Sequence, residues 1–402
     1  MKRFCLALVW FIVLGSVAHA GDVPGLPLRR GIAIDALAWA PAADGCRYDL
    51  GLFENRTQTL SDADLRRLRN TGFDFVRLAV DPGPFMQAQG TARAALDRVL
   101  TRAVTRILSA NLAVIVDFHP GDRCDDYDAR SLTSTGKKSR FDDYRQLLAH
   151  TARLLAGLRS DGVALEIMNE PPVAAPAWQP LLDAAYATVR AAAPDLAVVL
   201  DSGDDGQPSG LTAMDARHFS GDSKVLFTFH YYAPYQFTHQ GAPWNAARYL
   251  AGVPYPARAL PLNEALRATD RNIDNTGLPV ADKWLARLEA HHQLERYWHS
   301  AFELRNIVQD FDSVAQWARN NDIAADRILL GEFGARTAEP DAQPDLARAL
   351  WFHDVRETAE AHGFAWAVWV YQGTGGFALA DSSTGDIAPP IAKALGLKPV
   401  AR

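Results

Sequence analysis

The chain has 402 residues, of which 48% are hydrophobic and 22% are charged, and its formal net charge at pH 7 is −6. This composition is ordinary for a globular protein and excludes a wholly disordered chain. The mildly acidic balance and the lack of a basic run give no reason to expect nucleic acid or an anionic membrane surface as a partner.

The first twenty residues are predicted to be an export signal. Lys2 and Arg3 supply a short positive start, residues 4–17 are almost wholly apolar, and small residues precede a cleavage point after Ala20. The alternative, a membrane anchor, would need roughly 20 apolar residues to span a bilayer. We therefore expect residues 1–20 to be a signal peptide and the mature protein to be secreted or periplasmic, with no membrane attachment after cleavage.

Eight short apolar runs follow one another along residues 21–402. Several are continuous blocks of Val, Ile, Leu and Phe, as is typical of strands that are buried on both faces in a parallel sheet. Amphipathic stretches with helical spacing lie between them, and the first of these helices is expected to be capped by Ser61. The runs are residues 31–35, 73–78, 113–118, 163–168, 197–200, 225–229, 328–330 and 364–370.

Strands alternating with helices predict an α/β fold, a closed (β/α)8 TIM barrel formed by residues 21–402 as a single domain. The alternative is an open doubly wound sheet, which usually carries a glycine-rich phosphate loop after its first strand, and residues 33–37 do not form one. The interval 231–300 is much longer than an ordinary connection and is rich in proline and aromatic residues. We expect it to be an ordered insertion after strand 6, partly helical near residues 282–298.

The cysteines are few. Cys5 falls within the predicted signal peptide, which leaves Cys46 and Cys124 in the mature chain. An even pair in an exported protein predicts a disulfide, and both residues are expected in loops on the same face of the barrel. Two free thiols are the alternative, and a structural zinc site would need more ligands.

Polar and aromatic side chains stand at the ends of six of the predicted strands. In barrel enzymes the chemistry takes place where strands end and the following loops begin. Chance placement would scatter such residues, so we interpret them as a candidate site. They are Arg77, His119, Asn169 with Glu170, His230 with Tyr232, Glu332, and Trp369.

Two of these residues, Glu170 and Glu332, follow strands on roughly opposite sides of an eight-stranded ring. Their side chains can therefore meet across a bound sugar. Paired carboxyl groups suit cleavage of a glycosidic bond, because one protonates the departing oxygen while the other attacks the anomeric carbon or activates water. A neighbouring Glu332 carboxylate, together with partial burial, is expected to raise the pKa of Glu170.

The surrounding side chains fit supporting roles. Arg77 and Tyr232 are expected to hydrogen-bond the attacking carboxylate, and Asn169 is expected to bind the sugar 2-hydroxyl. Trp369 is expected to form a stacking floor for a pyranose ring. The two histidines at strand ends are expected to bind hydroxyls or to orient the glutamates.

Other interpretations of these residues stay open. A single glutamate, arginine or tryptophan at a strand end could instead cap a helix, join an ion pair or pack in the core. Asp117 with His119, or His291 with His292, could indicate a metal ion, but the spacing of known metal motifs is missing and no metal is expected. Serine chemistry is not indicated either, because no Gly-x-Ser-x-Gly follows a strand.

Taken in strand order, these motifs resemble glycoside hydrolase family 5, the large cellulase-containing family of retaining barrel enzymes. The resemblance covers nearly all of residues 21–402, and it is carried by the succession of motifs rather than by the short Asn-Glu-Pro sequence alone. The matching segments are residues 75–78 with Arg77, 114–119 with His119, 165–171 with Asn169 and Glu170, 229–232 with His230 and Tyr232, 331–334 with Glu332, and 366–369 with Trp369.

The resemblance implies that Glu170 is the catalytic acid/base and Glu332 the nucleophile of a hydrolysis with net retention, without metal or cofactor. It implies a β-linked polysaccharide or oligosaccharide as substrate, and we expect a monomer. An endo-β-1,4-glucanase is the first hypothesis. The second is the same chemistry on another β-glycan, such as mannan, a mixed-linkage glucan or an exopolysaccharide.

Two departures from the common family pattern leave the glycan open. The first strand, residues 30–35, lacks the Asn and Trp that are frequent there in cellulases, and the interval 231–300 is unusually long. A non-catalytic carbohydrate-binding barrel, or a structural barrel, is disfavoured because both glutamates are present.

Overall fold

The structure of the protein is a computed structural model, which describes residues 26, 28–43, 46–49, 61–136, 139–337, 346–373 and 375–398. The predicted signal peptide lies outside these residues. Within them, no helix combines the length and the apolar character that crossing a bilayer requires.

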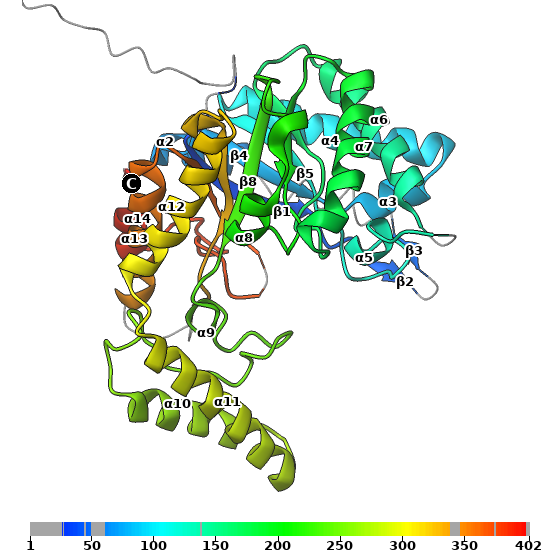
Figure 1. Ribbon diagram of the computed structural model, residues 1–402. Coiled ribbons are helices and arrows are strands. Elements are labelled where there is room, and N and C mark those ends of the chain that lie inside the picture. The colour runs from blue at the N-terminus through cyan, green and yellow to red at the C-terminus, as the bar shows by residue number, and fades with distance from the viewer. Residues whose placement is uncertain are drawn as a thin grey trace, which may run out of the picture.

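Eight parallel strands close into a barrel, which confirms the predicted fold (Figure 1). Around the ring the order is β1-β10-β9-β8-β7-β6-β5-β4, so neighbours along the chain are neighbours in the barrel. Each predicted apolar run overlaps one strand; the fourth and eighth strands end two residues earlier than predicted, and several others extend past the predicted run. The strands are β1 (Arg30–Leu37), β4 (Phe75–Val80), β5 (Ala113–Phe118), β6 (Val163–Glu166), β7 (Ala197–Asp201), β8 (Val225–Tyr231), β9 (Ile328–Phe333) and β10 (Ala365–Val368).

Helices surround the barrel and bury one apolar stripe each against it. In the first, Ser61 accepts a hydrogen bond from the Asp64 backbone N–H and Asp64 binds back to Ser61, which is the predicted cap. The helices are α2 (Asp62–Thr71), α3 (Pro82–Gln87), α4 (Gly90–Ser109), α5 (Ala129–Leu132), α6 (Phe141–Ala156), α7 (Ala175–Ala192), α8 (Pro208–Ala213), α12 (Leu304–Asn320), α13 (Leu346–Ala361) and α14 (Pro389–Ala394), with short 3-10 turns at Ala216–His218 and Ala325–Arg327.

The barrel interior is apolar at one end and polar at the other. Inward-facing residues near the strand starts form an apolar cluster of their own, which includes Phe75, Ile115 and Val199. Because side chains alternate along a strand, the residue two positions further on faces the same interior. Those next positions carry polar side chains instead, namely Arg77, Asp117, Glu166 and Asp201, and in β8 they are Thr228 and then His230. The strands therefore gather polar groups in one layer at their carboxyl ends.

Glu332 reaches this polar layer through a bulge in β9. The pairing of β8 with β9 skips Gly331, so β9 carries one extra residue there. A bulge re-aims the side chains that follow it. Without it, Glu332 would share the face of Leu330, which packs in the layer between barrel and helices. Gly331 suits the bulge, because a methyl group there would collide with the Thr228 hydroxyl and crowd His230.

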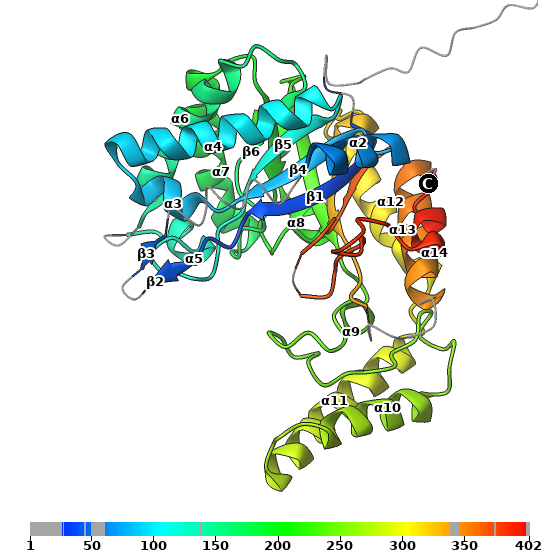
Figure 2. The same ribbon diagram turned by 180° about the vertical axis from the view of Figure 1, so that it is seen from behind.

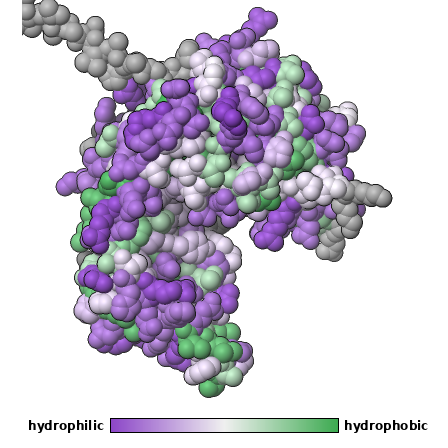
Figure 3. Space-filling view, viewed as in Figure 1, coloured by the Kyte–Doolittle hydropathy of each residue, from purple (hydrophilic) through white to green (hydrophobic). Residues whose placement is uncertain are grey.

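The predicted insertion after the sixth strand is ordered and largely helical. It contains α9 (Tyr235–Thr238), α10 (Leu262–Asp274) and α11 (Val280–Ser300), and α10 and α11 lie side by side beyond the barrel (Figures 1 and 2). The space-filling view shows a wide notch between this insertion and the barrel (Figure 3). Helix α11 contains the predicted helical stretch 282–298, whereas α10 was not predicted.

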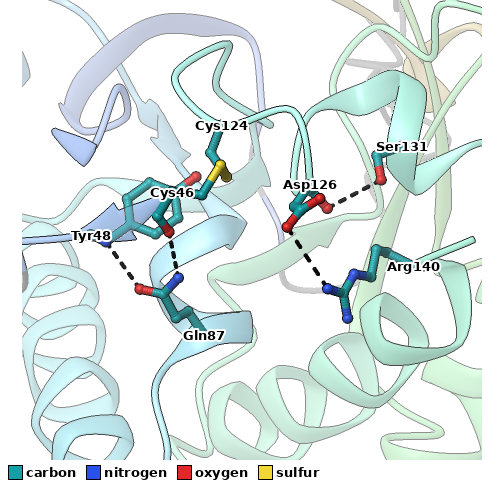
Figure 4. Close-up of a disulfide and its surroundings, with 7 residues drawn as sticks. All are labelled: Cys46, Tyr48, Gln87, Cys124, Asp126, Ser131 and Arg140. Atoms are coloured by element: carbon teal, nitrogen blue, oxygen red, sulfur yellow. Dashed lines mark hydrogen bonds and ion pairs between the residues drawn. A yellow bond between two sulfur atoms is a disulfide. The ribbon is translucent and has the colours of Figure 1, made fainter. Parts of the chain in front are cut away.

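A disulfide joins two loops near the ends of β1 and β5. Cys46 lies beside a small hairpin of β2 (Ala42–Ala43) and β3 (Arg47–Tyr48), and Cys124 follows β5. Their sulfur atoms are 2.07 Å apart (Figure 4). Gln87 supports the hairpin, because its side chain donates to the Cys46 carbonyl and accepts from the Tyr48 backbone N–H. Both cysteines thus lie in loops on the predicted face of the barrel.

Candidate active site

Arg77 is the hub of the polar layer. Its side chain is fully buried in β4, and its guanidinium binds Glu166 through two parallel hydrogen bonds of 2.8 and 2.7 Å. The same group donates to Glu332 at 2.6 Å and to the Asn169 side-chain oxygen at 2.8 Å. It also lies 3.1 Å from the Asp117 carboxylate. A planar guanidinium suits this task, since it fixes several acceptors at once.

Glu332 is held at both oxygens. One carboxylate oxygen accepts the hydrogen bond from Arg77, and the other accepts one of 2.8 Å from the Tyr232 hydroxyl. Only 4% of the residue is exposed. The two contacts that the sequence predicted for this carboxylate are therefore present, and they leave it little freedom to turn.

Glu170 follows β6 in a strained turn. Its φ is +43°, in the left-handed region that costs a residue with a side chain about 1–3 kcal/mol. The Asp201 carboxylate supports the turn by accepting the Glu170 backbone N–H at 2.8 Å. The Glu170 carboxyl lies 2.8 Å from His230 Nδ1, and 35% of the side chain remains exposed. The Glu170 carboxyl is thus fixed at one oxygen and partly open to solvent.

Burial raises the pKa of Glu170 to about 7, from an ordinary value of 4.5. Asp205 and Glu166 add to this rise, whereas His119 and Arg77 oppose it. The expected direction is therefore found, but the expected influence of Glu332 is not among these causes. A carboxyl group with this pKa holds its proton in an appreciable fraction of molecules near neutral pH.

His230 stays neutral at the pH where Glu170 titrates. Burial lowers the pKa of His230 to about 4. Its other ring nitrogen, Nε2, has no hydrogen-bond partner among the described residues and lies 3.9 Å from Asp201. A neutral imidazole can orient the Glu170 carboxyl through a hydrogen bond without adding a second positive charge to the site beside Arg77.

His119, Asn169 and Trp369 form a second side of the site. The ring of Trp369 stacks on that of His119, with centroids 5.2 Å apart and planes at 15°. His119 is fixed by the Asp117 carboxylate at 3.0 Å, and Trp39 meets its ring edge-on. Because Arg77 binds the Asn169 oxygen, the amide nitrogen of Asn169 is turned away from Arg77, 3.4 Å from His119 Nε2. The structure thus brings all eight predicted site residues together.

Three buried carboxyl groups of the site were not predicted as functional residues. They are Asp117, Glu166 and Asp201, each at most 1% exposed. The sequence indicated Asp117 only as a possible metal ligand together with His119. The available signal was an acidic residue at an inward-facing position of an otherwise apolar strand. Burial raises the pKa of Asp117 to about 7 and also raises the pKa of Glu166 and of Asp201.

The carboxylates and histidines are close enough to suggest metal ligation. Three overlapping groups have ligand atoms within 4.8 Å of one another: Asp117 with His119 and Glu332, Glu166 with Asp201 and His230, and Glu170 with His230 and Glu332. Each group includes a residue that Arg77 binds directly. A divalent cation would therefore have to sit beside a fixed guanidinium charge, which electrostatics disfavours. The residues do not fit a metal centre well.

The separation of the two glutamates limits the chemistry. One oxygen of Glu170 and one of Glu332 lie within 4.8 Å of each other. Carboxyl groups roughly 5–5.5 Å apart suit direct attack on a sugar, whereas roughly 6.5–9.5 Å leaves room for a water between them. The arrangement places one carboxyl group that is held at both oxygens beside one whose pKa is raised by burial.

Known proteins with this fold resemble the whole barrel. The cellulose synthase subunit Z from Clostridioides difficile superposes with a TM-score of 0.65 at 20% identity, over 92% of this chain and 99% of that one. A Thermotoga maritima protein solved in complex with mannotriose as substrate gives a TM-score of 0.64 at 18% identity, over 92% and 97% of the two chains. At this level of identity the likeness concerns the fold.

Sequence comparison gives a related result. Endoglucanase 3 of Fibrobacter succinogenes is 21% identical over 379 residues, which are 89% of this chain and 51% of that enzyme. The chain thus spans about half the length of that relative. The family model described as cellulase, glycosyl hydrolase family 5, matches residues 45–375. The chain therefore belongs to the cellulase family, glycosyl hydrolase family 5.

Proposed function

We propose that this protein is a retaining endo-β-1,4-glucanase that works by double displacement, with Glu170 as acid/base and Glu332 as nucleophile. The observation that carries the proposal is that one oxygen of Glu170 and one oxygen of Glu332 lie within 4.8 Å of each other. An inverting enzyme would need a wider gap to place water opposite the leaving group. The second candidate is the same chemistry on another β-glycan.

In the first step, a Glu332 oxygen attacks the anomeric carbon and forms a bond to it. The glycosidic carbon–oxygen bond breaks, and the leaving oxygen takes the proton of Glu170. Arg77 and Tyr232 position the attacking carboxylate, and His230 holds the acid toward the cleft. The amide nitrogen of Asn169 is available to the sugar 2-hydroxyl.

In the second step, the roles of Glu170 reverse. The Glu170 carboxylate takes a proton from a water molecule, whose oxygen attacks the anomeric carbon. The bond between that carbon and Glu332 breaks, which releases the sugar and restores both glutamates to their starting states. Two inversions at one carbon leave its configuration unchanged. All reacting groups belong to the chain, the substrate or water, so we propose no metal or cofactor.

The choice of a β-1,4-glucan draws on the relatives. The Fibrobacter relative is an endoglucanase, and the Clostridioides neighbour is a subunit of cellulose synthase. The Thermotoga structure with mannotriose keeps other β-glycans, including mannan, mixed-linkage glucan and an exopolysaccharide, as the second candidate. A non-catalytic carbohydrate-binding barrel remains a distant third, since it would not need both glutamates.

The test is reducing-sugar release from barley β-glucan, carboxymethyl cellulose, xyloglucan, glucomannan and galactomannan. We expect activity on one or two of these, and a loss of at least about 1000-fold in Glu332→Ala. Glu295→Ala, an exposed glutamate of α11, is the matched control and should keep full activity. A folded wild-type protein that cleaves none of the five would contradict the endoglucanase proposal.

Azide separates the roles of the two glutamates. With an activated aryl glycoside, azide should restore Glu170→Ala and give a glycosyl azide of retained configuration, because Glu332 still forms the intermediate. In Glu332→Ala, the rescued product should be inverted. The opposite pattern of products would exchange the two assignments.

We further propose that the protein is exported, to the periplasm or out of the cell, and that it acts as a monomer. The disulfide supports export, because such bonds persist in oxidising compartments. Cell fractionation together with sequencing of the mature N-terminus tests the predicted cleavage after Ala20. Light scattering of the purified protein tests the monomer.

A further inference from the structure

Asp201 binds the backbone beneath the proposed acid. Its side chain is fully buried at the end of β7, and one of its oxygens, Oδ2, accepts the backbone N–H of Glu170 at 2.8 Å. The other oxygen, Oδ1, accepts the backbone N–H of Ser202 at 2.7 Å. Oδ2 also lies 3.9 Å from Nε2 of His230, whose other ring nitrogen contacts the Glu170 carboxyl. One buried carboxyl group therefore lies against both members of the Glu170–His230 pair.

The loop that follows β7 is also attached to the chain just after Glu170. The backbone N–H of Asp204 donates to the Val173 carbonyl at 2.8 Å. The backbone N–H of Asp205 donates to the Pro171 carbonyl at 3.2 Å. These two hydrogen bonds add to the one made by the buried carboxyl, and together the three fasten the loop to the turn that carries the acid.

The same loop curls back onto its own carboxyl group and reaches the next strand. Asp204, Asp205 and Gly206 have φ values of +56°, +55° and +68°, all in the left-handed region. A side-chain carbon at Gly206 would lie 3.0 Å from Oδ1 of Asp201, so glycine suits both the conformation and the close approach. The Gly206 carbonyl accepts the backbone N–H of His230 at 2.7 Å. The loop is thus joined to the acid turn on one side and to β8 on the other.

The Glu170 turn needs such support. Its φ of +43° is unfavourable for a residue with a side chain, and it persists only where the surroundings hold it. A general acid must lie within hydrogen-bond reach of the oxygen that it protonates, and a displacement of about 1 Å can cost about 100-fold in rate. The position of this backbone therefore bears directly on proton transfer.

We infer that Asp201 is a positioning residue for the acid step, which holds the Glu170 backbone so that the Glu170 carboxyl meets the departing oxygen. Because its side chain is fully buried, Asp201 acts through Glu170 and not by contact with the sugar. The inference rests on the proposed glycosidase function. It makes Asp201 matter most for substrates whose leaving group needs a proton.

The test measures kcat/KM of Asp201→Asn on two substrates that differ in their need for an acid. One is the glycan of the five-member panel that the wild type cleaves fastest, and the other is the 2,4-dinitrophenyl β-glycoside of the matching disaccharide, whose leaving group departs without a proton. The amide keeps the size of the carboxyl but has one acceptor oxygen, so its NH2 would face one of the two N–H groups. We expect the ratio of kcat/KM on the glycan to that on the aryl glycoside to fall at least about tenfold.

Two further variants complete the comparison. Asp74→Asn is the matched control, because the Asp74 carboxyl also accepts backbone N–H groups, those of Arg29 at 2.9 Å and Arg30 at 3.1 Å, but at the opposite end of the barrel. Its ratio should stay at the wild-type value. Gly206→Ala keeps the Asp201 carboxyl and pushes against it, so it should lower the ratio in the same direction as Asp201→Asn.

The outcomes separate this inference from the proposed function. A folded wild type that is inactive on both kinds of substrate overturns the glycosidase function and the positioning role with it. An active wild type whose ratio is unchanged in a folded Asp201→Asn overturns the positioning role alone. Equal losses on both substrates would show a merely structural role and would overturn it too. If thermal melting shows Asp201→Asn to be unfolded at the assay temperature, the ratio in Gly206→Ala decides by the same criteria.

Discussion

At the scale of single residues, the site holds its two glutamates in different surroundings. Glu170 has one oxygen on a neutral histidine and remains open to the cleft, whereas both oxygens of Glu332 are engaged. Burial acts on Glu170 strongly enough to raise its pKa to about 7. The surroundings of Glu170 thus favour its protonated form more than water does.

The pH profile should report this pKa. In the proposed mechanism Glu170 works as the acid only while it holds its proton, so kcat/KM on the glycan should fall as the pH rises through about 7. A mechanism that needs one protonated and one ionised carboxyl group should give a bell-shaped profile. A profile that is flat from about pH 3 to pH 9 would contradict the two-carboxylate mechanism.

A variant can assign the alkaline limb. Burial also raises the pKa of Asp117 to about 7, so this group could titrate in the same range. An aryl glycoside with a good leaving group needs no acid in the first step, so Glu170→Ala can still cleave it. If Glu170 is the source of the alkaline limb, the kcat/KM of this variant should not fall as the pH rises through about 7. If the limb survives in that variant, Asp117 rather than Glu170 is its source.

At the scale of elements, the strands were predictable and their irregularity was not. Each barrel strand overlaps a short, mainly apolar run, a pattern that one stretch of sequence contains by itself. The bulge at Gly331 depends on the pairing of β9 with β8, which no single strand reveals. Glu332 was nevertheless found, because it follows an apolar run directly.

The unpredicted residues have related causes. Glu166 is the last residue of β6, but the predicted strand extends to residue 168, so a search of predicted strand ends passes over it. Asp201 ends a strand, but its role comes from a backbone N–H of Glu170, 31 positions earlier in the chain. Helix α10 directly follows the proline-rich part of the insertion, so its amphipathic spacing was not recognised as a helix in the sequence.

The bulge gives a prediction of its own. Gly331→Ala should lower activity by at least about 100-fold, because the added methyl group meets the Thr228 hydroxyl and forces β9 to shift, and Glu332 with it. Gly277→Ala, where an added methyl group meets nothing within 4 Å, is the control. Wild-type kcat in Gly331→Ala would show that the position of Glu332 does not depend on the bulge.

At the scale of the whole molecule, the disulfide acts on the unfolded chain. It links residues 78 positions apart, and so it removes many conformations that the unfolded chain would otherwise sample. The hairpin that it fixes stands beside the loop after β5, on the same face of the barrel as the site. Because the disulfide constrains the unfolded chain, its contribution should appear in the free energy of unfolding rather than in the chemical step.

Replacing both Cys46 and Cys124 by serine should lower the free energy of unfolding by about 2–4 kcal/mol. Urea unfolding followed by tryptophan fluorescence measures this change. Dithiothreitol should bring the wild-type protein to the stability of the double variant and leave the double variant unchanged. Equal stability of all four samples would show that the bond carries no such constraint.

The polar layer of the barrel should also disfavour acidic sugars at the reacting position. Five carboxyl groups surround the Arg77 guanidinium, namely Asp117, Glu166, Glu170, Asp201 and Glu332. Burial lowers the pKa of His119 and of His230, which disfavours their charged forms. A uronic acid at the reacting position would bring one more negative charge into this water-poor space without a cation to meet it. We therefore expect the centre to accept neutral hexoses and to pass over chains in which every unit is acidic, however well their linkage fits the cleft.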